Sequence, residues 1–222
     1  MPRSAAHLQP VYARDPGLPP GISMWLCDLA ALPWNLDQCR ALLPPEPAPT
    51  PAPLRPIAHL RRLQTRALLH LLLAEQLGVA PQQLTPTLGP NGKPELPGLA
   101  FNSSHSGDWA LLGLGPVPAL GVDLEVQRPR RQLSDLTSYC LCDREVLLWN
   151  SIPNEEQLLT FYCIWTAKEA ALKAWGRGID QLQQVALDHL LRPAQARLSG
   201  HTPCRIHSLV LPGPLVGALA LA

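Results

Sequence analysis

A glutamate and a lysine that are spaced to share one helix face stand near residue 170 of this 222-residue chain. In the stretch Trp165-Thr-Ala-Lys-Glu-Ala-Ala-Leu-Lys173, aromatic and apolar residues recur at helical spacing among many alanines, which predicts an amphipathic helix with a slim side. Glu169 and Lys173 are four residues apart and therefore lie on one face, with Lys168 beside them. Such a pair is either an ordinary surface ion pair or part of a site for a metal ion or a phosphate, and its spacing alone does not decide between them.

A second acidic stretch, Gly121-Val-Asp-Leu-Glu-Val126, alternates apolar and polar residues and predicts a strand. Asp123 and Glu125 then share one face, with their carboxylates about 7 Å apart. Two such carboxylates repel each other unless a cation lies near them. Mg²⁺ suits this arrangement, because it needs few protein carboxylates when substrate phosphates supply its other ligands. The solvent-facing side of an ordinary strand would fit the alternation equally well.

Two further stretches carry groups that suit phosphate oxygens. Leu99 to Gly107 predicts a short strand that ends in serines, a histidine and a glycine, where small donors and backbone N–H groups can converge. A plain serine-rich loop is the alternative, and a Ser-His hydrolase is disfavoured because the adjacent Ser104 and His105 point apart in an extended segment. Upstream, the turn-rich loop from Leu88 to Pro94 presents Lys93 between a glycine and a proline.

Three arginines lie on the first turns of a predicted helix that runs from Ile57 to a natural end at Gly78. Arg61, Arg62 and Arg66 gain nothing from the helix dipole, which favours anions at that end. They therefore favour an external anion or an acidic partner, although a solvated face is an equally good interpretation.

The composition limits the possible partners and compartments. Eighteen basic and seventeen acidic residues give a formal charge of +1, which offers no sign of a nucleic-acid or membrane-surface binder. Six scattered cysteines without zinc spacing predict reduced thiols in a cytoplasmic protein. No signal peptide or transmembrane run is apparent. From this and the balanced charge, we expect neither membrane nor nucleic acid among the partners.

The order of elements predicts an α+β fold. Strand patterns over residues 22–32 and 99–126, a helix over 134–149 and a closing hairpin over 204–222 accompany the two long helices. A proline-rich segment, 43–56, reads as an extended connector. A faint duplication (Gly78-Val79 before a glutamine pair, Gly178-Ile179 before another) suggests two similar α/β lobes, each an antiparallel sheet packed with a long helix, as in a pseudo-dimer. We expect lobes at 1–115 and 116–222, a site at their interface, and a monomer.

Taken together, Asn102-Ser-Ser-His-Ser106, Gly121-Val-Asp-Leu-Glu125 and Trp165-Thr-Ala-Lys-Glu-Ala-Ala-Leu-Lys173 resemble the 4′-phosphopantetheinyl transferases, in particular the large two-lobed type. The family pattern is Gly-(Val/Ile)-Asp followed by Trp-(Ser/Thr/Cys)-x-Lys-Glu-(Ala/Ser)-x-x-Lys, and both parts are present in order. The resemblance covers Arg61 to Ile179. Ser103 and Thr166 depart slightly from the common residues, and the first 56 residues match nothing firmly.

The resemblance implies a role for each matching residue. Asp123, Glu125 and Glu169 would hold Mg²⁺ against the pyrophosphate of coenzyme A, and Lys173 would bind one of its phosphates. Ser104 and His105 would contact the 3′-phosphoadenosine end, and Lys93 and Pro94 would flank the adenine. The residues so assigned to coenzyme A are Arg62, Arg66, Lys93, Pro94, Ser104, His105, Asp123, Lys168 and Lys173.

The implied reaction moves 4′-phosphopantetheine from coenzyme A to a serine of an apo acyl or peptidyl carrier protein in fatty-acid, polyketide or nonribosomal peptide synthesis. It asks mainly for positioning and charge neutralisation by Mg²⁺ and a lysine. Glu169 is our first candidate for the base, before Lys168 and His105. The acidic helix of the carrier would dock near the lobe interface, against Arg128, Arg130 and Arg131.

Two rival functions stay open at this stage. A metal-dependent nuclease also uses an Asp, a Glu and a Lys around Mg²⁺, but its last acid and lysine are normally two apart on a strand, whereas Glu169 and Lys173 are four apart. The near-neutral charge also disfavours DNA. The other rival is a module that binds a carrier protein or coenzyme A with a vestigial site.

Overall fold

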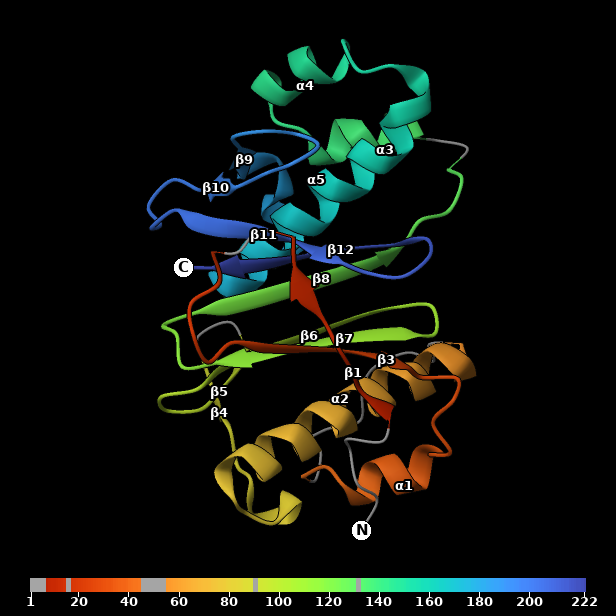
Figure 1. Ribbon diagram of the computed structural model, residues 1–222, viewed down its shortest axis with the longest axis vertical. Coiled ribbons are helices and arrows are strands. Elements are labelled where there is room, and N and C mark those ends of the chain that lie inside the picture. The colour runs from red at the N-terminus through yellow and green to blue at the C-terminus, as the bar shows by residue number, and fades with distance from the viewer. Residues whose placement is uncertain (1–6, 15–16, 45–54, 90–91, 131–132) are drawn as a thin grey trace.

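The computed structural model describes residues 7–14, 17–44, 55–89, 92–130 and 133–222, arranged in four layers (Figure 1). Two antiparallel sheets lie face to face in the middle, and a long helix covers the outer face of each. The predicted α+β class with antiparallel sheets and long helices is therefore confirmed. The relation of the two halves as a pseudo-dimer and the division into 1–115 and 116–222 stay predictions. Most of the predicted connector, residues 45–54, lies outside the described residues.

The first sheet has the strand order β1-β3-β7-β6. Its strands are β1 (Gln9–Pro10), β3 (Ser23–Asp28), β7 (Trp109–Gly115) and β6 (Ala100–Ser106). The helix α2 (Pro56–Leu77) packs its buried leucines on the outer face of this sheet, and the short α1 (Leu36–Ala41) lies beside it. As predicted, α2 ends at Gly78, which adopts the left-handed conformation with φ of 67°.

The second sheet has the order β8-β12-β11-β10-β9. Its strands are β8 (Leu120–Val126), β12 (Leu215–Leu221), β11 (Cys204–Val210), β10 (Gln195–Arg197) and β9 (Ala186–Leu187). The predicted closing hairpin is confirmed, because β11 and β12 pair antiparallel. The 21-residue helix α5 (Asn154–Ala174) covers the outer face.

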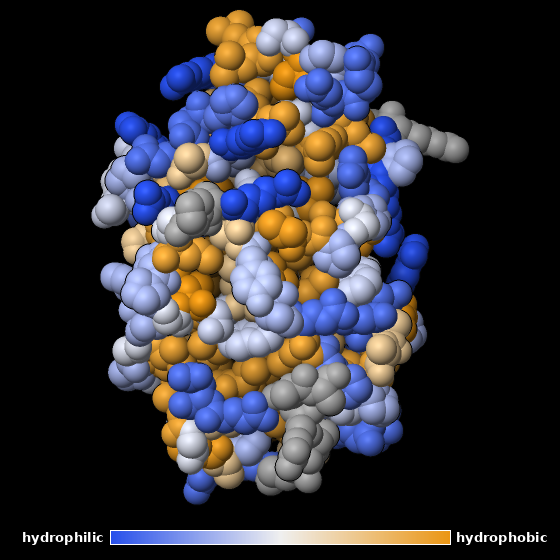
Figure 2. All heavy atoms as spheres, viewed as in Figure 1, coloured by the Kyte–Doolittle hydropathy of each residue, from blue (hydrophilic) through white to orange (hydrophobic). Residues whose placement is uncertain are grey.

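The helix predicted over 134–149 is two helices, α3 (Leu133–Cys140) and α4 (Asp143–Trp149). The break has a local cause: the carboxylate of Glu145 accepts a hydrogen bond of 3.0 Å from the backbone N–H of Cys142 and so starts a new helix there. Figure 2 shows apolar side chains gathered at the end of the molecule occupied by α4, where Val146, Leu147 and Leu148 are exposed.

A buried apolar layer fills the space between the two sheets. Val122 and Leu124 of β8 point into this layer beside Leu111 of β7, which leaves Asp123 and Glu125 on the opposite face of β8, as the alternation predicts. The N-terminal segment joins both sheets, because β1 pairs with β3 and the next strand, β2 (Tyr12–Ala13), pairs with β11.

The remaining elements are short. β4 (Thr87–Leu88) and β5 (Pro94–Glu95) form a two-stranded ribbon. The 3-10 helices η2 (Pro81–Gln83) and η3 (Ile179–Gln184) follow α2 and α5. Within the described ranges, none of the helices combines the length and apolar character that would let it cross a membrane.

Candidate active site at the seam between the sheets

The edge strands β6 and β8 meet along a polar seam, which we define by the side chains of Asn102, Ser104 and Ser106 and the strand that they face. The amide oxygen of Asn102 accepts a hydrogen bond of 3.0 Å from the N–H of Val122, and the Ser106 hydroxyl accepts one of 3.1 Å from the N–H of Val126. Side chains therefore satisfy backbone donors on the free edge of β8, where a neighbouring strand would otherwise do so.

The same serines hold the two carboxylates of β8. The Ser104 hydroxyl donates to Oδ1 of Asp123 at 2.7 Å, and the Ser106 hydroxyl donates to Oε2 of Glu125 at 2.6 Å. Asp123 is buried and Glu125 is partly buried, so both carboxylates are held in fixed directions away from bulk water. The predicted pairing of Asp123 and Glu125 on one face is thus joined to the serine segment of β6.

Lys173 brings the helix α5 into this group. Its Nζ lies 2.6 Å from Oδ1 of Asp123, 3.2 Å from the Ser104 hydroxyl and 3.5 Å from Oε2 of Glu169. Burial by itself lowers the pKa of Lys173, but the charges of Asp123 and Glu169 outweigh this and raise it, so the ammonium stays protonated at neutral pH. The two stretches that the sequence singled out therefore meet in one charged cluster.

A glycine allows this close approach. At Gly121 a Cβ atom would lie 2.1 Å from the carbonyl oxygen of Ala170 and 2.5 Å from the backbone N of Ala174. Real Cβ atoms do not come so near to backbone atoms, so only glycine lets α5 lie this close to β8. The small alanines of α5 that face the strand complete the slim side that the sequence predicts.

The acidic groups of the cluster strongly affect one another's pKa values. Burial, the negative charge of Asp123 and that of Glu125 raise the pKa of Glu169 to about 7, although Lys173 acts against this. Burial also raises the pKa of Glu125, with Asp123 adding to the effect and the hydrogen bond from Ser106 opposing it. Three carboxylates thus share a partly desolvated space with one ammonium, and the cluster lacks positive charge.

One atom of the cluster indicates where a cation would bind. Oδ2 of Asp123 is buried and has no hydrogen-bond partner, and a buried carboxylate oxygen without a partner is costly. In the part of the chain that the structure describes, no group of three or more His, Cys, Asp or Glu side chains is arranged to hold a metal ion by itself. The donors therefore fit a hard cation such as Mg²⁺ only if substrate oxygens or water complete its shell.

The basic residues predicted for the nucleotide end are only partly brought to the cluster. His105 lies on β6 and keeps an exposed edge; partial desolvation and the charges of Lys173 and Arg62 lower its pKa. Arg66 lies further along α2, where its charge adds to the effect of burial in lowering the pKa of His70. Arg61 differs from the prediction of an external anion, because it pairs at 2.7 Å with Asp108 of the same chain.

Lys168 is not part of the cluster. Its side chain is fully buried on another face of α5, where Nζ donates to Glu145 at 2.5 Å and to the carbonyl oxygens of Cys140 and Leu182 at 2.7 and 3.3 Å. Successive helical residues point about 100° apart, so the neighbour of Glu169 faces inward. Lys168 fixes α4 to α5, and its predicted contact with coenzyme A finds no support in this placement.

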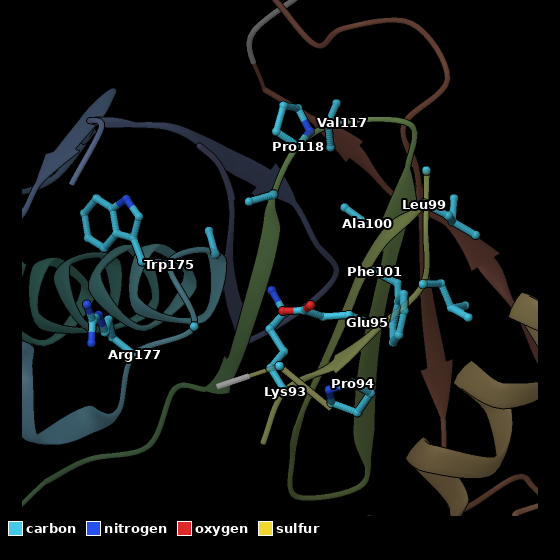
Figure 3. Close-up of a pocket in the computed structure, with 16 residues that line it drawn as sticks. Lys93, Pro94, Glu95, Leu99, Ala100, Phe101, Val117, Pro118, Trp175 and Arg177 are labelled. Atoms are coloured by element: carbon cyan, nitrogen blue, oxygen red, sulfur yellow. The ribbon is translucent and has the colours of Figure 1, made fainter. Parts of the chain in front are cut away.

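A cavity of about 490 Å³ adjoins the cluster, and a second one of about 610 Å³ shares part of its lining. The smaller one is lined by Lys173 and Asn102 of the seam, and both are lined by Lys93 and Arg177. The larger cavity, shown in Figure 3, is bordered by Pro94 and by apolar side chains of β6 and its approach. Lys93, which was predicted to flank the adenine, therefore lines both cavities, and Pro94, predicted for the same role, lines the larger and more apolar one.

Several residues of this region were given no role of their own by the sequence analysis. Asn102 and Ser106 could have been found from their two-residue spacing with Ser104, which places all three on one face of the strand. Gly121 stands two residues before Asp123, but the residues that it contacts, Ala170 and Ala174, lie about fifty residues away in the chain. Glu145 and Arg177 gave no signal, because the one is an ordinary helical acid and the other stands in a Gly-Arg-Gly turn.

The chain resembles known proteins over the same region. Residues 119–220 match the model of the 4′-phosphopantetheinyl transferase superfamily. A Synechocystis protein named, provisionally, a 4′-phosphopantetheinyl transferase is 42% identical over 147 residues, which cover 64% of this chain and 60% of that protein. The Nostoc 4′-phosphopantetheinyl transferase HetI is 36% identical over 172 residues, or 74% of this chain and 72% of HetI. The Escherichia coli 4′-phosphopantetheinyl transferase AcpT is 36% identical over 115 residues, covering 51% of this chain and 58% of AcpT.

Proposed function

The chain belongs to the 4′-phosphopantetheinyl transferase superfamily, and from this premise we propose that it transfers 4′-phosphopantetheine from coenzyme A to a serine hydroxyl of an apo carrier protein. The observation that carries the proposal is the cluster of Asp123, Glu125, Glu169 and Lys173 beside a hollow with cationic walls. Fatty-acid, polyketide and nonribosomal peptide carriers are the candidate substrates. All six cysteines are free of disulfides in the structure, which agrees with action in a reducing compartment such as the cytoplasm.

Coenzyme A would lie with its phosphates near Lys173, whose raised pKa keeps it cationic. Ser104 and His105 would contact the nucleotide end, together with Arg62, and Arg66 would act at longer range. The adenine would lie in the larger cavity near Pro94, whose apolar lining suits a flat ring. In this arrangement the phosphates of coenzyme A face the cations, and its adenine faces apolar side chains.

A divalent metal, most simply Mg²⁺, would be held by Asp123 through its unpartnered Oδ2, with Glu125 and Glu169 nearby directly or through water. The donors are all oxygens, which suits a hard cation. When bound, such an ion neutralises charge on the phosphates that react.

The chemical step forms a bond between the carrier serine oxygen and the β-phosphorus of coenzyme A. The phosphoanhydride bond breaks, and adenosine 3′,5′-bisphosphate leaves with the bonding electron pair. Glu169 accepts the serine proton, directly or through a water, because a pKa of about 7 lets it be ionised yet basic near neutral pH. Lys173 stabilises the charge that develops on the phosphates.

The carrier would dock where two exposed arginines follow β8. The hydroxyl of Tyr162 on α5 accepts hydrogen bonds from Nε of Arg130 at 3.0 Å and from the backbone N–H of Arg128 at 3.1 Å, which fixes this segment. Arg130 also acts on the pKa of Glu125, so it lies near the cluster. An acidic helix held there would bring its serine toward Glu169. Arg131 lies outside the described residues.

The deciding experiment measures the intact mass of several apo carrier proteins after incubation with this protein, coenzyme A and Mg²⁺. We expect the mass of one phosphopantetheinyl group to be added, and we expect EDTA and Glu169→Gln to prevent it. No mass gain on any carrier, with Mg²⁺-dependent binding of coenzyme A still present, would indicate a binding module; cleavage of plasmid DNA would indicate a nuclease.

A further inference from the structure

The ammonium of Lys93 joins the two elements that carry the charged cluster. It donates hydrogen bonds to the carbonyl oxygen of Lys173 at 2.8 Å and to that of Leu120 at 3.0 Å. Lys173 stands in the last turn of α5, and Leu120 is the first residue of β8. One side chain therefore binds the backbone of both elements whose side chains form the central ion pair.

The chemistry of the contact favours a cation. Carbonyl groups at the C-terminal end of a helix carry partial negative charge, and an ammonium placed there is stabilised. Lys93 is partly buried, and burial lowers its pKa while the nearby charge of Glu95 opposes this. An ammonium has three N–H donors, and two of them are used by these carbonyls. One N–H donor is left over.

The use of lysine in the whole chain points the same way. Only three of the eighteen basic residues are lysines, namely 93, 168 and 173. All three ammonium groups donate to acceptors inside the protein. An ammonium is a compact charge that can reach several carbonyl oxygens at once, whereas the planar guanidinium suits flat or bidentate partners. Each of the three lysines thus links segments of the protein that are distant in the sequence.

We propose that Lys93 is a positioning residue, which sets Lys173 against Asp123 by tying the end of α5 to the start of β8. This differs from a direct contact between its ammonium and the adenine end of coenzyme A. Without the tie, the last turn of α5 is free to move away from β8, and the ammonium of Lys173 moves with it. The inference rests on the proposed transferase function only for its effect on turnover.

The test compares Lys93→Met, Lys93→Arg and the native chain in transfer to an apo carrier. Lys93→Met should lower kcat by about 10-fold and change the KM for coenzyme A by less than about 3-fold, since displacement of a catalytic group by a fraction of an ångström has such effects. Lys93→Arg keeps a cationic N–H donor and should restore part of the turnover, because a guanidinium binds the two carbonyls less well than an ammonium does. Melting curves show whether each variant is folded.

A second readout does not need activity. In protein labelled with ¹⁵N-lysine, the side-chain ammonium region holds three signals, one for each lysine. Lys93→Met should remove its own signal and weaken that of Lys173 through faster proton exchange, while the buried Lys168 serves as an internal control. The signal of Lys173 should persist in Lys93→Arg.

The outcomes separate this inference from the proposed function. An unchanged Lys173 signal and kcat in Lys93→Met, with only the KM for coenzyme A raised, would overturn the positioning role and make Lys93 a direct ligand. A weakened Lys173 signal in a protein whose native form modifies no carrier would support the tie and refute the transferase.

Discussion

The contact at Gly121 gives the sharpest test of how the candidate active site is assembled. An alanine there would place its Cβ 2.1 Å from the carbonyl oxygen of Ala170 and 2.5 Å from the backbone N of Ala174. Carbon and carbonyl oxygen atoms need about 3.3 Å, so α5 must retreat by about 1.2 Å. Because both obstacles are backbone atoms, no change of rotamer relieves the contact.

The retreat has a calculable effect on the cluster. The Lys173 Nζ lies 2.6 Å from Oδ1 of Asp123, and a shift of the helix by about 1.2 Å would stretch this to about 3.8 Å, beyond a hydrogen bond. Misplacement of about 1 Å costs on the order of 100-fold in rate. Overpacking of this kind costs about 1–3 kcal/mol of stability. We therefore expect Gly121→Ala to fold but to lose most of its turnover.

The assay is the rate of mass gain of an apo carrier, with melting measured in parallel. The matched control is Val122→Ala on the same strand, whose side chain points into the layer between the sheets. It should lower stability by about 2 kcal/mol through a lost buried side chain, yet change kcat by less than about 3-fold. Gly121→Ala with native kcat and native melting would refute the spacing argument, and so would an equal loss of kcat in both variants.

Three other changes test separate parts of the site. Because the pKa of Glu169 is raised to about 7 from 4.5, the folded state binds its proton more tightly, and this stabilisation is lost as pH rises from about 4.5 to 7. Glu169→Gln should therefore gain stability relative to the native chain as pH rises through this window, as urea unfolding at pH 5 and 7.5 would show; a constant difference would contradict it. Lys168→Met leaves Glu145 buried without its cationic partner and should cost about 3–5 kcal/mol of stability in denaturant titrations. The KM of the folded fraction for coenzyme A should stay within about 2-fold of the native value. A selective rise in that KM would instead indicate that Lys168 contacts coenzyme A. The double variant Arg128→Glu/Arg130→Glu should raise the KM for the carrier by at least about 10-fold and weaken its salt dependence, without changing that for coenzyme A; an unchanged KM for the carrier would exclude docking there.

The sequence predicts those parts of the site that follow from local periodicity. The two-residue period of β8 predicts that Asp123 and Glu125 share a face, and the four-residue spacing predicts the same of Glu169 and Lys173. Both relations hold in the structure, because backbone geometry alone fixes them. The family resemblance then linked the two stretches, which periodicity could not do.

The missed features depend on partners that are distant in the chain. Helical spacing places Lys168 on a different face from Glu169 and Lys173, but it does not show that this face turns to the core. The helix predicted over 134–149 breaks where Glu145 binds Cys142, and although this bond is local, the burial of that acid depends on Lys168, 23 residues away. The sequence leaves Arg61 available to an external anion, because its ion-pair partner, Asp108, lies 47 residues away in the chain. Each case requires knowledge of which elements pack together.

The seam explains why charge gathers where it does. Two edge strands meet at β6 and β8, and the N–H groups of Val122 and Val126 must be satisfied there without a ladder of backbone bonds. Short polar side chains on β6 meet this need and at the same time orient two carboxylates. Those carboxylates are stable only with a cation, and the close packing of α5 at Gly121 supplies Lys173. One ammonium among three acids still leaves an excess of negative charge, so the architecture that satisfies the backbone of β8 also leaves a place where a further cation would be stabilised.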